Sequence, residues 1–349
     1  MKKLQIMRYL LLLMVFQISL FSQNAIEFTG YKGNVNSVAF SPDSRYMLSG
    51  DEKGNLILWD ISSAQKIHSL QTSENITSVN FSPAEKDLAL YTTYGGDVTI
   101  IKASTREILK TLNKNGNVYY AEFSPDGKQL AIAYTREPTE KEETKGIRLN
   151  FIVDLHETSK FEKTKTLRLS KPHDPDGELF GSNFFETYRY NSFSCAFSSN
   201  SLYLASGSMG KNIAIYSFDL KTFAPTYKGH SSRVMFVAFS PDGNYLASAS
   251  KDETAKIWNV SSGGSIVTLK GHTGNVNSVA FSPDSRYLAT ASNDETIKIW
   301  DVKTSALLKT ISSLNGEMIT VKFSPDDKYL AAAGSNEKVL MWEVSQLLQ

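Results

Sequence analysis

The sequence predicts an all-β fold, a seven-bladed β-propeller of four-stranded antiparallel blades whose ring is closed by the N-terminal strand of the mature chain. An anchor motif, Phe-Ser-Pro, recurs about every 42 residues, which indicates repeated units that cannot bury both of their faces alone. Within each period, short β-rich runs alternate with turn residues. The anchors are Phe40, Phe81, Phe123, Phe197 (a degenerate copy), Phe239, Phe281 and Phe323.

The sixth repeat shows one predicted blade. Residues 275–282, 287–292, 296–301 and 307–311 are β-rich runs, and clusters of Pro, Asp, Asn and Ser separate the first three. Such clusters between β-branched runs are typical of hairpin turns. Four short antiparallel strands therefore make one blade.

The two ends of the propeller predict how the ring closes. The seventh repeat reaches its third strand at Val339 to Val344, too close to Gln349 for a regular fourth strand. Residues 25–28 precede the first strand of repeat 1 and resemble the outer strand of a blade. We expect them to complete blade 7.

Residues 1–22 are predicted to be a secretory signal peptide, and residues 23–349 to be the propeller. Three basic residues precede the apolar stretch 9–16, and small residues follow it, as in signal peptides. The alternative is an uncleaved membrane anchor, but the apolar stretch is short and is interrupted by Gln17 and Ser19. We expect an exported protein, periplasmic or secreted to the cell surface, with no stable membrane insertion after cleavage.

The composition excludes several classes of function. The chain has 349 residues with 37 Lys and Arg against 36 Asp and Glu, so it lacks the basic excess expected of a nucleic-acid-binding protein. The single cysteine, Cys195, cannot form an internal disulfide, and zinc-ligand spacings are absent. We expect no metal, no cofactor and a monomer, with Cys195 buried as a small hydrophobic residue.

Dipeptides inside the repeats resemble the WD40 family. Gly-His occurs at 229–230 and 271–272, each followed at the same spacing by a tryptophan, and Trp-Asp occurs at 59–60 and 300–301. The resemblance covers residues 24–349, and with the predicted leader the chain resembles an exported, bacterial member. It implies a non-catalytic protein-interaction scaffold that binds partner proteins or peptides.

The resemblance also implies a buried hydrogen-bonded tetrad in two blades. A buried carboxylate and a buried indole N–H each need a partner, and linked polar groups polarise one another. Because the same set recurs in successive blades, we interpret it as structural and not as a Ser-His-Asp hydrolase site. The tetrads are His230, Ser248, Asp252 and Trp258 in blade 5, and His272, Thr290, Asp294 and Trp300 in blade 6.

Blades 1 and 7 depart from the tetrad pattern. Blade 1 has Lys53 where the aspartate is expected, and blade 7 has Ala332 and Asn336 at two of the tetrad positions. We therefore expect these blades to depend more on apolar packing. His68 and His156 are predicted to stand alone.

A contact site is predicted on the top face, which carries the connections from strand d to the next strand a and from strand b to strand c. The resemblance implies that the residues six and four positions before each anchor phenylalanine lie on this top face. Blades 3 to 5 offer large apolar side chains beside polar ones, as binding hot spots do. The predicted contact residues are Asn117, Tyr119, Asn191, Phe193, Arg233 and Met235.

Two long connections, at about 136–146 and 170–189, fall on the same sector of the top face. Neutral insertions are the alternative, since surface loops tolerate extra length. Aromatic residues of the second connection are also an alternative cover for Tyr119, Phe193 and Met235.

The competing functional class is an enzyme or small-ligand-binding propeller that uses the central channel. Histidines, carboxylates or metal ligands along the channel would favour it. The strand-start positions contain one acidic residue, Glu317, and no histidine. The sequence therefore favours a scaffold.

Overall fold

The computed structural model describes residues 25–137, 139–140, 150–168, 194–207, 211–224, 226–312 and 314–349. The predicted signal peptide, the 170–189 connection, Asn191, Phe193 and most of the 136–146 connection lie outside the described residues. Among the residues described, no helix is both long and apolar enough to cross a bilayer.

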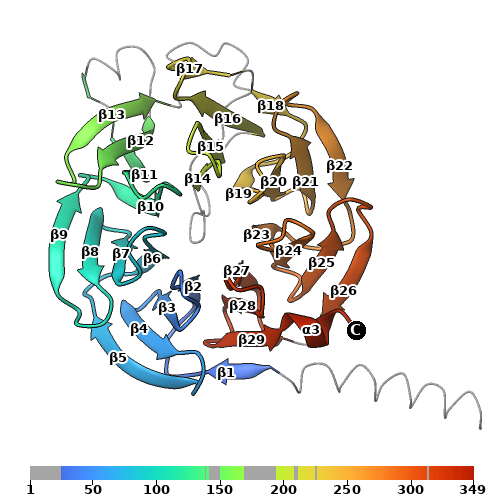
Figure 1. The fold of residues 1–349 in the computed structure, drawn as a ribbon, viewed down its shortest axis with the longest axis horizontal. Coiled ribbons are helices and arrows are strands. Elements are labelled where there is room, and N and C mark those ends of the chain that lie inside the picture. Colours follow the sequence, from blue (N-terminus) through green and yellow to red (C-terminus); the bar gives the residue numbers. More distant parts are fainter. Residues whose placement is uncertain are drawn as a thin grey trace, which may run out of the picture.

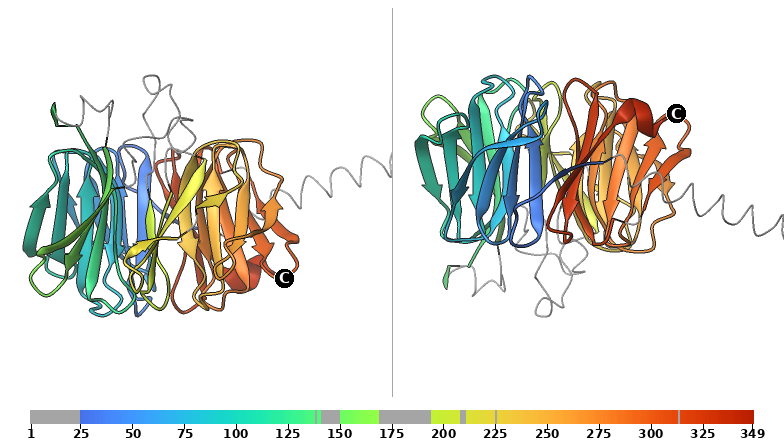
Figure 2. Two further views of the ribbon diagram at one scale, coloured as in Figure 1. Left: turned by 90° about the horizontal axis from the view of Figure 1, so that it is seen from above. Right: turned by 90° about the horizontal axis from the view of Figure 1, so that it is seen from below.

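Seven antiparallel sheets surround a common centre, each with its first strand innermost (Figure 1). Figure 2 shows the ring from the side, with the strands running between its two faces. The predicted all-β seven-bladed propeller is confirmed.

The blades follow the chain. Blade 1 is β2 (Val35–Phe40), β3 (Tyr46–Asp51), β4 (Asn55–Asp60) and β5 (Gln65–Gln71). Blade 2 is β6 (Ile76–Phe81), β7 (Leu88–Thr93), β8 (Asp97–Lys102) and β9 (Ile108–Asn113). Blade 3 is β10 (Asn117–Phe123), β11 (Gln129–Arg136), β12 (Asn150–Glu157) and β13 (Lys163–Arg168). Blade 4 is β14 (Cys195–Phe197), β15 (Tyr203–Gly207), β16 (Asn212–Ser217) and an outer strand split into β17 (Thr222–Phe223) and β18 (Tyr227–Lys228).

The last three blades are the most regular. Blade 5 is β19 (Val234–Phe239), β20 (Tyr245–Ser250), β21 (Ala255–Asn259) and β22 (Ser265–Leu269). Blade 6 is β23 (Val276–Phe281), β24 (Tyr287–Ser292), β25 (Ile297–Asp301) and β26 (Leu307–Ile311). Blade 7 is β27 (Met318–Phe323), β28 (Tyr329–Gly334) and β29 (Val339–Glu343), followed by the short helix α3 (Val344–Leu347).

The ring is closed by β1 (Ile26–Phe28), which is the outer strand of blade 7 (Figure 1). It runs antiparallel to β29, with Ile26 opposite Met341 and Phe28 opposite Val339. The buried Phe28 ring packs edge-on against Trp59 of blade 1, with 5.2 Å between ring centroids. The predicted closure is therefore confirmed, and it joins the first blade to the last.

Neighbouring blades are also joined by side chains of their inner strands. The hydroxyl of Ser37 accepts a hydrogen bond from Val79 N at 3.1 Å, and the hydroxyl of Ser78 accepts one from Ala121 N at 3.2 Å. Ser194 and Ser278 repeat this contact further around the ring. These bonds satisfy buried backbone donors that lie between two sheets. Blades 3 and 5 have Tyr120 and Phe236 at the equivalent position.

Candidate functional site

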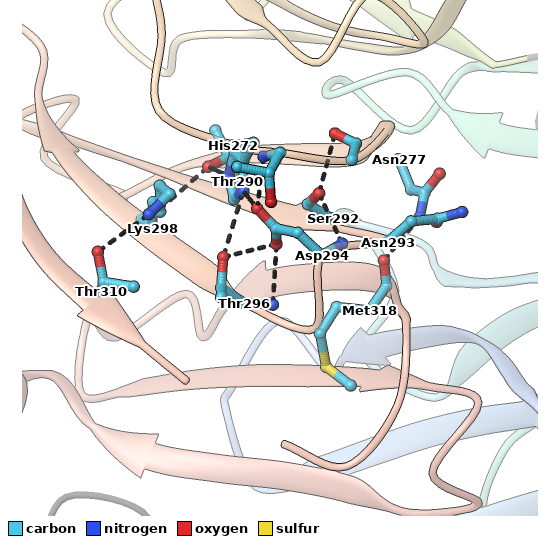
Figure 3. Close-up of polar contacts among 12 residues, drawn as sticks. His272, Asn277, Thr290, Ser292, Asn293, Asp294, Thr296, Lys298, Thr310 and Met318 are labelled. Atoms are coloured by element: carbon cyan, nitrogen blue, oxygen red, sulfur yellow. Dashed lines mark hydrogen bonds and ion pairs between the residues drawn. The ribbon is translucent and has the colours of Figure 1, made fainter. Parts of the chain in front are cut away.

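In the tetrad of blade 6, His272 from the loop before the blade contacts Thr290 of the second strand and Asp294 of the following turn (Figure 3). His272 Nδ1 lies 2.7 Å from Asp294 Oδ2, and His272 Nε2 lies 2.7 Å from Thr290 Oγ1. Trp300 Nε1 donates to the same hydroxyl at 3.1 Å. Burial lowers the pKa of His272, and Asp294 only partly opposes this effect. The geometry fits a neutral imidazole that donates to the carboxylate and accepts from the hydroxyl.

Blade 5 repeats this arrangement. His230 lies 2.8 Å from Asp252 Oδ2 and 2.7 Å from Ser248 Oγ, and Trp258 Nε1 donates to Ser248 Oγ at 2.8 Å. Ser248 and Thr290 are both 0% exposed. A hydroxyl without access to solvent cannot attack a substrate, so the resemblance to a hydrolase triad has no catalytic consequence here.

Blade 1 contains a polar network that the sequence analysis missed. Tyr31 takes the place of the histidine, with its hydroxyl 2.6 Å from Ser49 Oγ, and Trp59 Nε1 donates to both oxygens at 3.0 Å. The carboxylate comes from Asp51, which accepts from Lys53 N and Asn55 N. Blade 1 was expected to depend more on apolar packing, but it keeps a buried polar network at this place. A phenol supplies the same donor and acceptor functions as the neutral imidazole.

Blade 3 contains a second unforeseen network, so the prediction that His156 stands alone is wrong. Lys114 Nζ lies 3.0 Å from Asp154 Oδ2 and 2.7 Å from His156 Nε2. His156 Nδ1 lies 3.0 Å from the Phe161 carbonyl, and Thr166 donates to Asp154 at 2.6 Å. The side chains of Lys114 and Asp154 are 7% and 2% exposed.

Electrostatics explains the protonation states in this network. Burial lowers the pKa of Lys114 and of His156, and Lys114 lowers the pKa of His156 further. Burial alone would raise the pKa of Asp154, but hydrogen bonds from Thr166 and Lys114, with the charge of Lys114, hold it below its usual value. The arrangement is a lysine–aspartate ion pair beside a neutral imidazole.

Blade 7 lacks such a network. Trp342 is buried, and its indole Nε1 has no hydrogen-bond partner among the described residues. Leu314 and Ala332 pack in the same apolar cluster, where blade 6 has His272 and Thr290. Blade 7 therefore leaves one buried donor unsatisfied.

The predicted contact residues have different surroundings. Asn117, Tyr119 and Arg233 are partly exposed, whereas Met235 is only 3% exposed. Met235 therefore does not offer the exposed apolar side chain that was expected. Asn191 and Phe193 lie outside the described residues.

Several polar strand-start residues hold blades together. Asn36 Nδ2 donates to the Ile76 carbonyl at 2.9 Å, and Thr77 Oγ1 donates to the Val118 carbonyl at 2.9 Å. Asn277 donates to the Met318 carbonyl in the same way. These side chains are thus engaged within the ring.

Tyr119 belongs to an aromatic pair that sequence analysis did not identify. Its ring lies 6.0 Å from the ring of Tyr94, edge to face at 86°. Tyr94 comes from the turn between β7 and β8 of blade 2 and is 40% exposed. The pair therefore spans blades 2 and 3 on the top face. The aromatic residue in a Gly-rich turn was the available sequence signal.

The channel side of the inner strands carries a second unforeseen cluster. Tyr120 and Phe236 meet edge to face with 5.5 Å between ring centroids, although β14 separates their strands in the ring. Lys322 Nζ lies 5.0 Å from the centroid of the Phe236 ring, and Tyr120 donates to Glu122 at 3.3 Å. These two buried rings thus join blades 3 and 5 within one apolar cluster. In the described part of the chain, no group of three or more His, Cys, Asp or Glu residues is placed to hold a metal ion.

Comparison with known proteins agrees with this geometry. The family described as "WD domain, G-beta repeat" matches residues 22–60, which include the first three strands of blade 1. The family described as "IFT122 first beta-propeller" matches residues 191–348. The chain is a seven-bladed propeller with segments similar to WD40 repeats.

Curated relatives of this chain include proteins named "Small ribosomal subunit protein RACK1" from two yeasts and "Small ribosomal subunit protein RACK1z" from rice. The Candida albicans protein is 29% identical over 33% of this chain and 38% of its own length. The Schizosaccharomyces pombe protein is 32% identical over 30% of this chain and 36% of its own. The rice protein is 32% identical over 30% of this chain and 34% of its own. Each match thus spans less than two fifths of the relative.

Proposed function

We propose that this propeller is a non-catalytic scaffold that binds a protein or peptide through its top face. The contact region is the one predicted over blades 3 to 5, extended to Tyr94 of blade 2. One observation carries the proposal: the exposed Tyr94 ring packs against Tyr119 across two blades. Tyrosine supplies a large contact area with a polar tip, which is why it is enriched in binding hot spots.

Two further observations support a scaffold. The hydroxyls of the His-Ser-Asp and His-Thr-Asp sets are buried, which removes the one constellation that resembles a hydrolase site. The relatives are named as proteins of the small ribosomal subunit, which is an assembly of many macromolecules. Distant similarity to components of an assembly favours a binding role.

Selection of peptides from a random phage-displayed library on the immobilised propeller tests the proposal. We expect the selected peptides to bind the wild-type chain and to lose at least about tenfold in affinity for a Tyr94→Ser/Tyr119→Ser variant. The matched control is Leu220→Ser, which removes an exposed side chain from the turn between β16 and β17. Binding that the tyrosine variant retains, with an unchanged melting temperature, would disprove this site.

We also propose that the chain acts outside the cytoplasm, on the basis of the signal-like pattern in residues 1–22. Expression in a bacterial host, followed by fractionation and mass measurement, tests this. Cleavage near residue 22 and recovery outside the cytoplasm are expected. An uncleaved cytoplasmic protein would contradict export.

A further inference from the structure

The Glu74 carboxylate lies against Gly95, the residue that follows Tyr94 in the chain. Glu74 belongs to the loop between β5 and β6, and Tyr94 N donates to the carbonyl of the next residue, Asn75, at 3.0 Å. Thr72 anchors this loop, since its backbone N–H donates to the Gly54 carbonyl at 2.8 Å and its hydroxyl donates to the Glu74 carbonyl at 2.7 Å. The loop and the turn that carries Tyr94 are therefore held against each other.

Gly95 determines where the Glu74 side chain rests. A Cβ atom at position 95 would collide with both carboxylate oxygens of Glu74. The carboxylate thus occupies the space that the absent side chain of Gly95 leaves, directly after Tyr94 in the chain. The missing Cβ allows the negative charge to lie against the turn that carries Tyr94.

Glu74 is one of several exposed glutamates that form no ion pair among the described residues. Glu27 and Glu107 each form an ion pair with a lysine at 2.7 Å, whereas Glu74 forms none. Two basic side chains near the neighbouring top-face turns, Lys53 and Arg136, contact other groups than Glu74. Lys53 pairs with Glu52 at 3.4 Å, and Arg136 donates to the Glu137 carbonyl at 2.8 Å. The charge of Glu74 is therefore available to a partner.

An aromatic face and an unpaired carboxylate together favour a cation. The negative face of a tyrosine ring attracts guanidinium and ammonium groups, and a carboxylate adds direct ion pairing. An apolar side chain would use the rings but would desolvate Glu74 without compensation. An acidic side chain would be repelled.

We propose that Tyr94, Tyr119 and Glu74 form a subsite for a cationic side chain, arginine or lysine, of a bound peptide. This rests on the proposed function of the top face and specifies the chemistry of the partner there. Arginine fits best, because its planar guanidinium can stack on a ring while donating to the carboxylate.

The test uses the peptides selected from the random library in the experiment above. We expect these peptides to share an arginine or lysine. Replacement of that arginine by citrulline, which keeps the shape and removes the charge, or of that lysine by glutamine, should weaken binding about tenfold. Glu74→Gln should weaken the cationic peptide to a similar extent and abolish the difference between charged and neutral peptides.

Two further variants make the result specific. Gly95→Ala displaces the Glu74 carboxylate but keeps its charge in the protein, and it should weaken the cationic peptide as Glu74→Gln does. Glu107→Gln removes an exposed carboxylate from the start of the outer strand of blade 2 and should change nothing. The melting temperature of each variant verifies folding.

The outcomes separate the two proposals. If the tyrosine variant loses the peptides but neither their charge nor Glu74 matters, the cationic subsite is wrong and the top-face function stands. If the tyrosine variant keeps the peptides, the proposed function itself fails. A loss in both the tyrosine and Glu74 variants that depends on the peptide charge supports both.

Discussion

Blades 3 and 6 have a buried polar network at the same place but build it from different residues. In blade 6, Leu288 pairs with Trp300, and in blade 3 the equivalent Leu130 pairs with His156. Lys114 stands at the same distance before its anchor phenylalanine as His272 does. The indole is thus replaced by an imidazole, and the imidazole by an ammonium.

The charges of the two networks are reversed along the third strand. Lys298 on β25 lies opposite Thr310. Asp154 on β12 lies opposite Thr166 and accepts a hydrogen bond from its hydroxyl. Blade 6 has its acid in the turn at Asp294 and a base on the strand, whereas blade 3 has its acid on the strand. The blade geometry therefore demands satisfied polar groups at this place but does not require particular residues.

Loss of the buried Asp154 carboxylate of blade 3 should reduce the free energy of unfolding most. Asp154→Ala leaves the Lys114 ammonium buried without its partner and should reduce the free energy of unfolding by about 3–5 kcal/mol. Urea denaturation measures it. The double variant Lys114→Met/Asp154→Ala should lose less than Asp154→Ala alone, because no unpaired charge remains. A double variant less stable than the single one would contradict the ion-pair interpretation.

Loss of the tetrad histidine should have a smaller effect, because no unpaired buried ammonium remains. His230→Ala leaves Ser248 and Asp252 without their shared partner and should cost about 1–3 kcal/mol. Thermal and urea denaturation measure it. His68→Ala is the matched control, since that ring makes a single bond to the Ala103 carbonyl and should cost less. An unchanged melting temperature for His230→Ala would disprove the structural role.

Acidification should destabilise both kinds of network. Burial lowers the pKa of His156, His230 and His272 below 6.5, so the unfolded chain binds more protons as the pH falls through 6.5. The free energy of unfolding should therefore decrease from pH 7 to pH 5, as urea titrations at each pH would show. His156→Gln should flatten part of this dependence, and an unaltered slope would contradict the assignment of a neutral His156.

Introducing a hydroxyl into blade 7 should change the free energy of unfolding least, and should increase it. Ala332 stands where blade 6 has Thr290, so Ala332→Ser would supply an acceptor for the unpartnered Trp342 Nε1. The expected gain is about 1 kcal/mol in the free energy of unfolding. Ala331→Ser, on the same buried strand but in a different cluster, is the control and should destabilise. A loss for both variants would show that the hydroxyl does not reach the indole.

The tetrads of blades 5 and 6 could be predicted from the sequence because their residues recur with the repeat. His272 and Thr290 stand at constant distances from Phe281, so their equivalents in blade 5 follow from the period. Blade 3 could not be aligned in this way, because the long connection after Arg136 changes the spacing to its third strand. Asp154 and His156 therefore matched no pattern until their strand register was known.

Sequence alone determined the propeller, its seven blades and its closure by β1, because these depend on local periodicity and on a strand missing from the last repeat. The tertiary structure decided which groups from different blades meet. Tyr94 and Tyr119, and Tyr120 and Phe236, are brought together by the curvature of the ring. The repeat pattern in the sequence indicates which face of a strand a residue occupies. It does not indicate the distance between residues on separate sheets, because that distance depends on sheet packing and loop conformation.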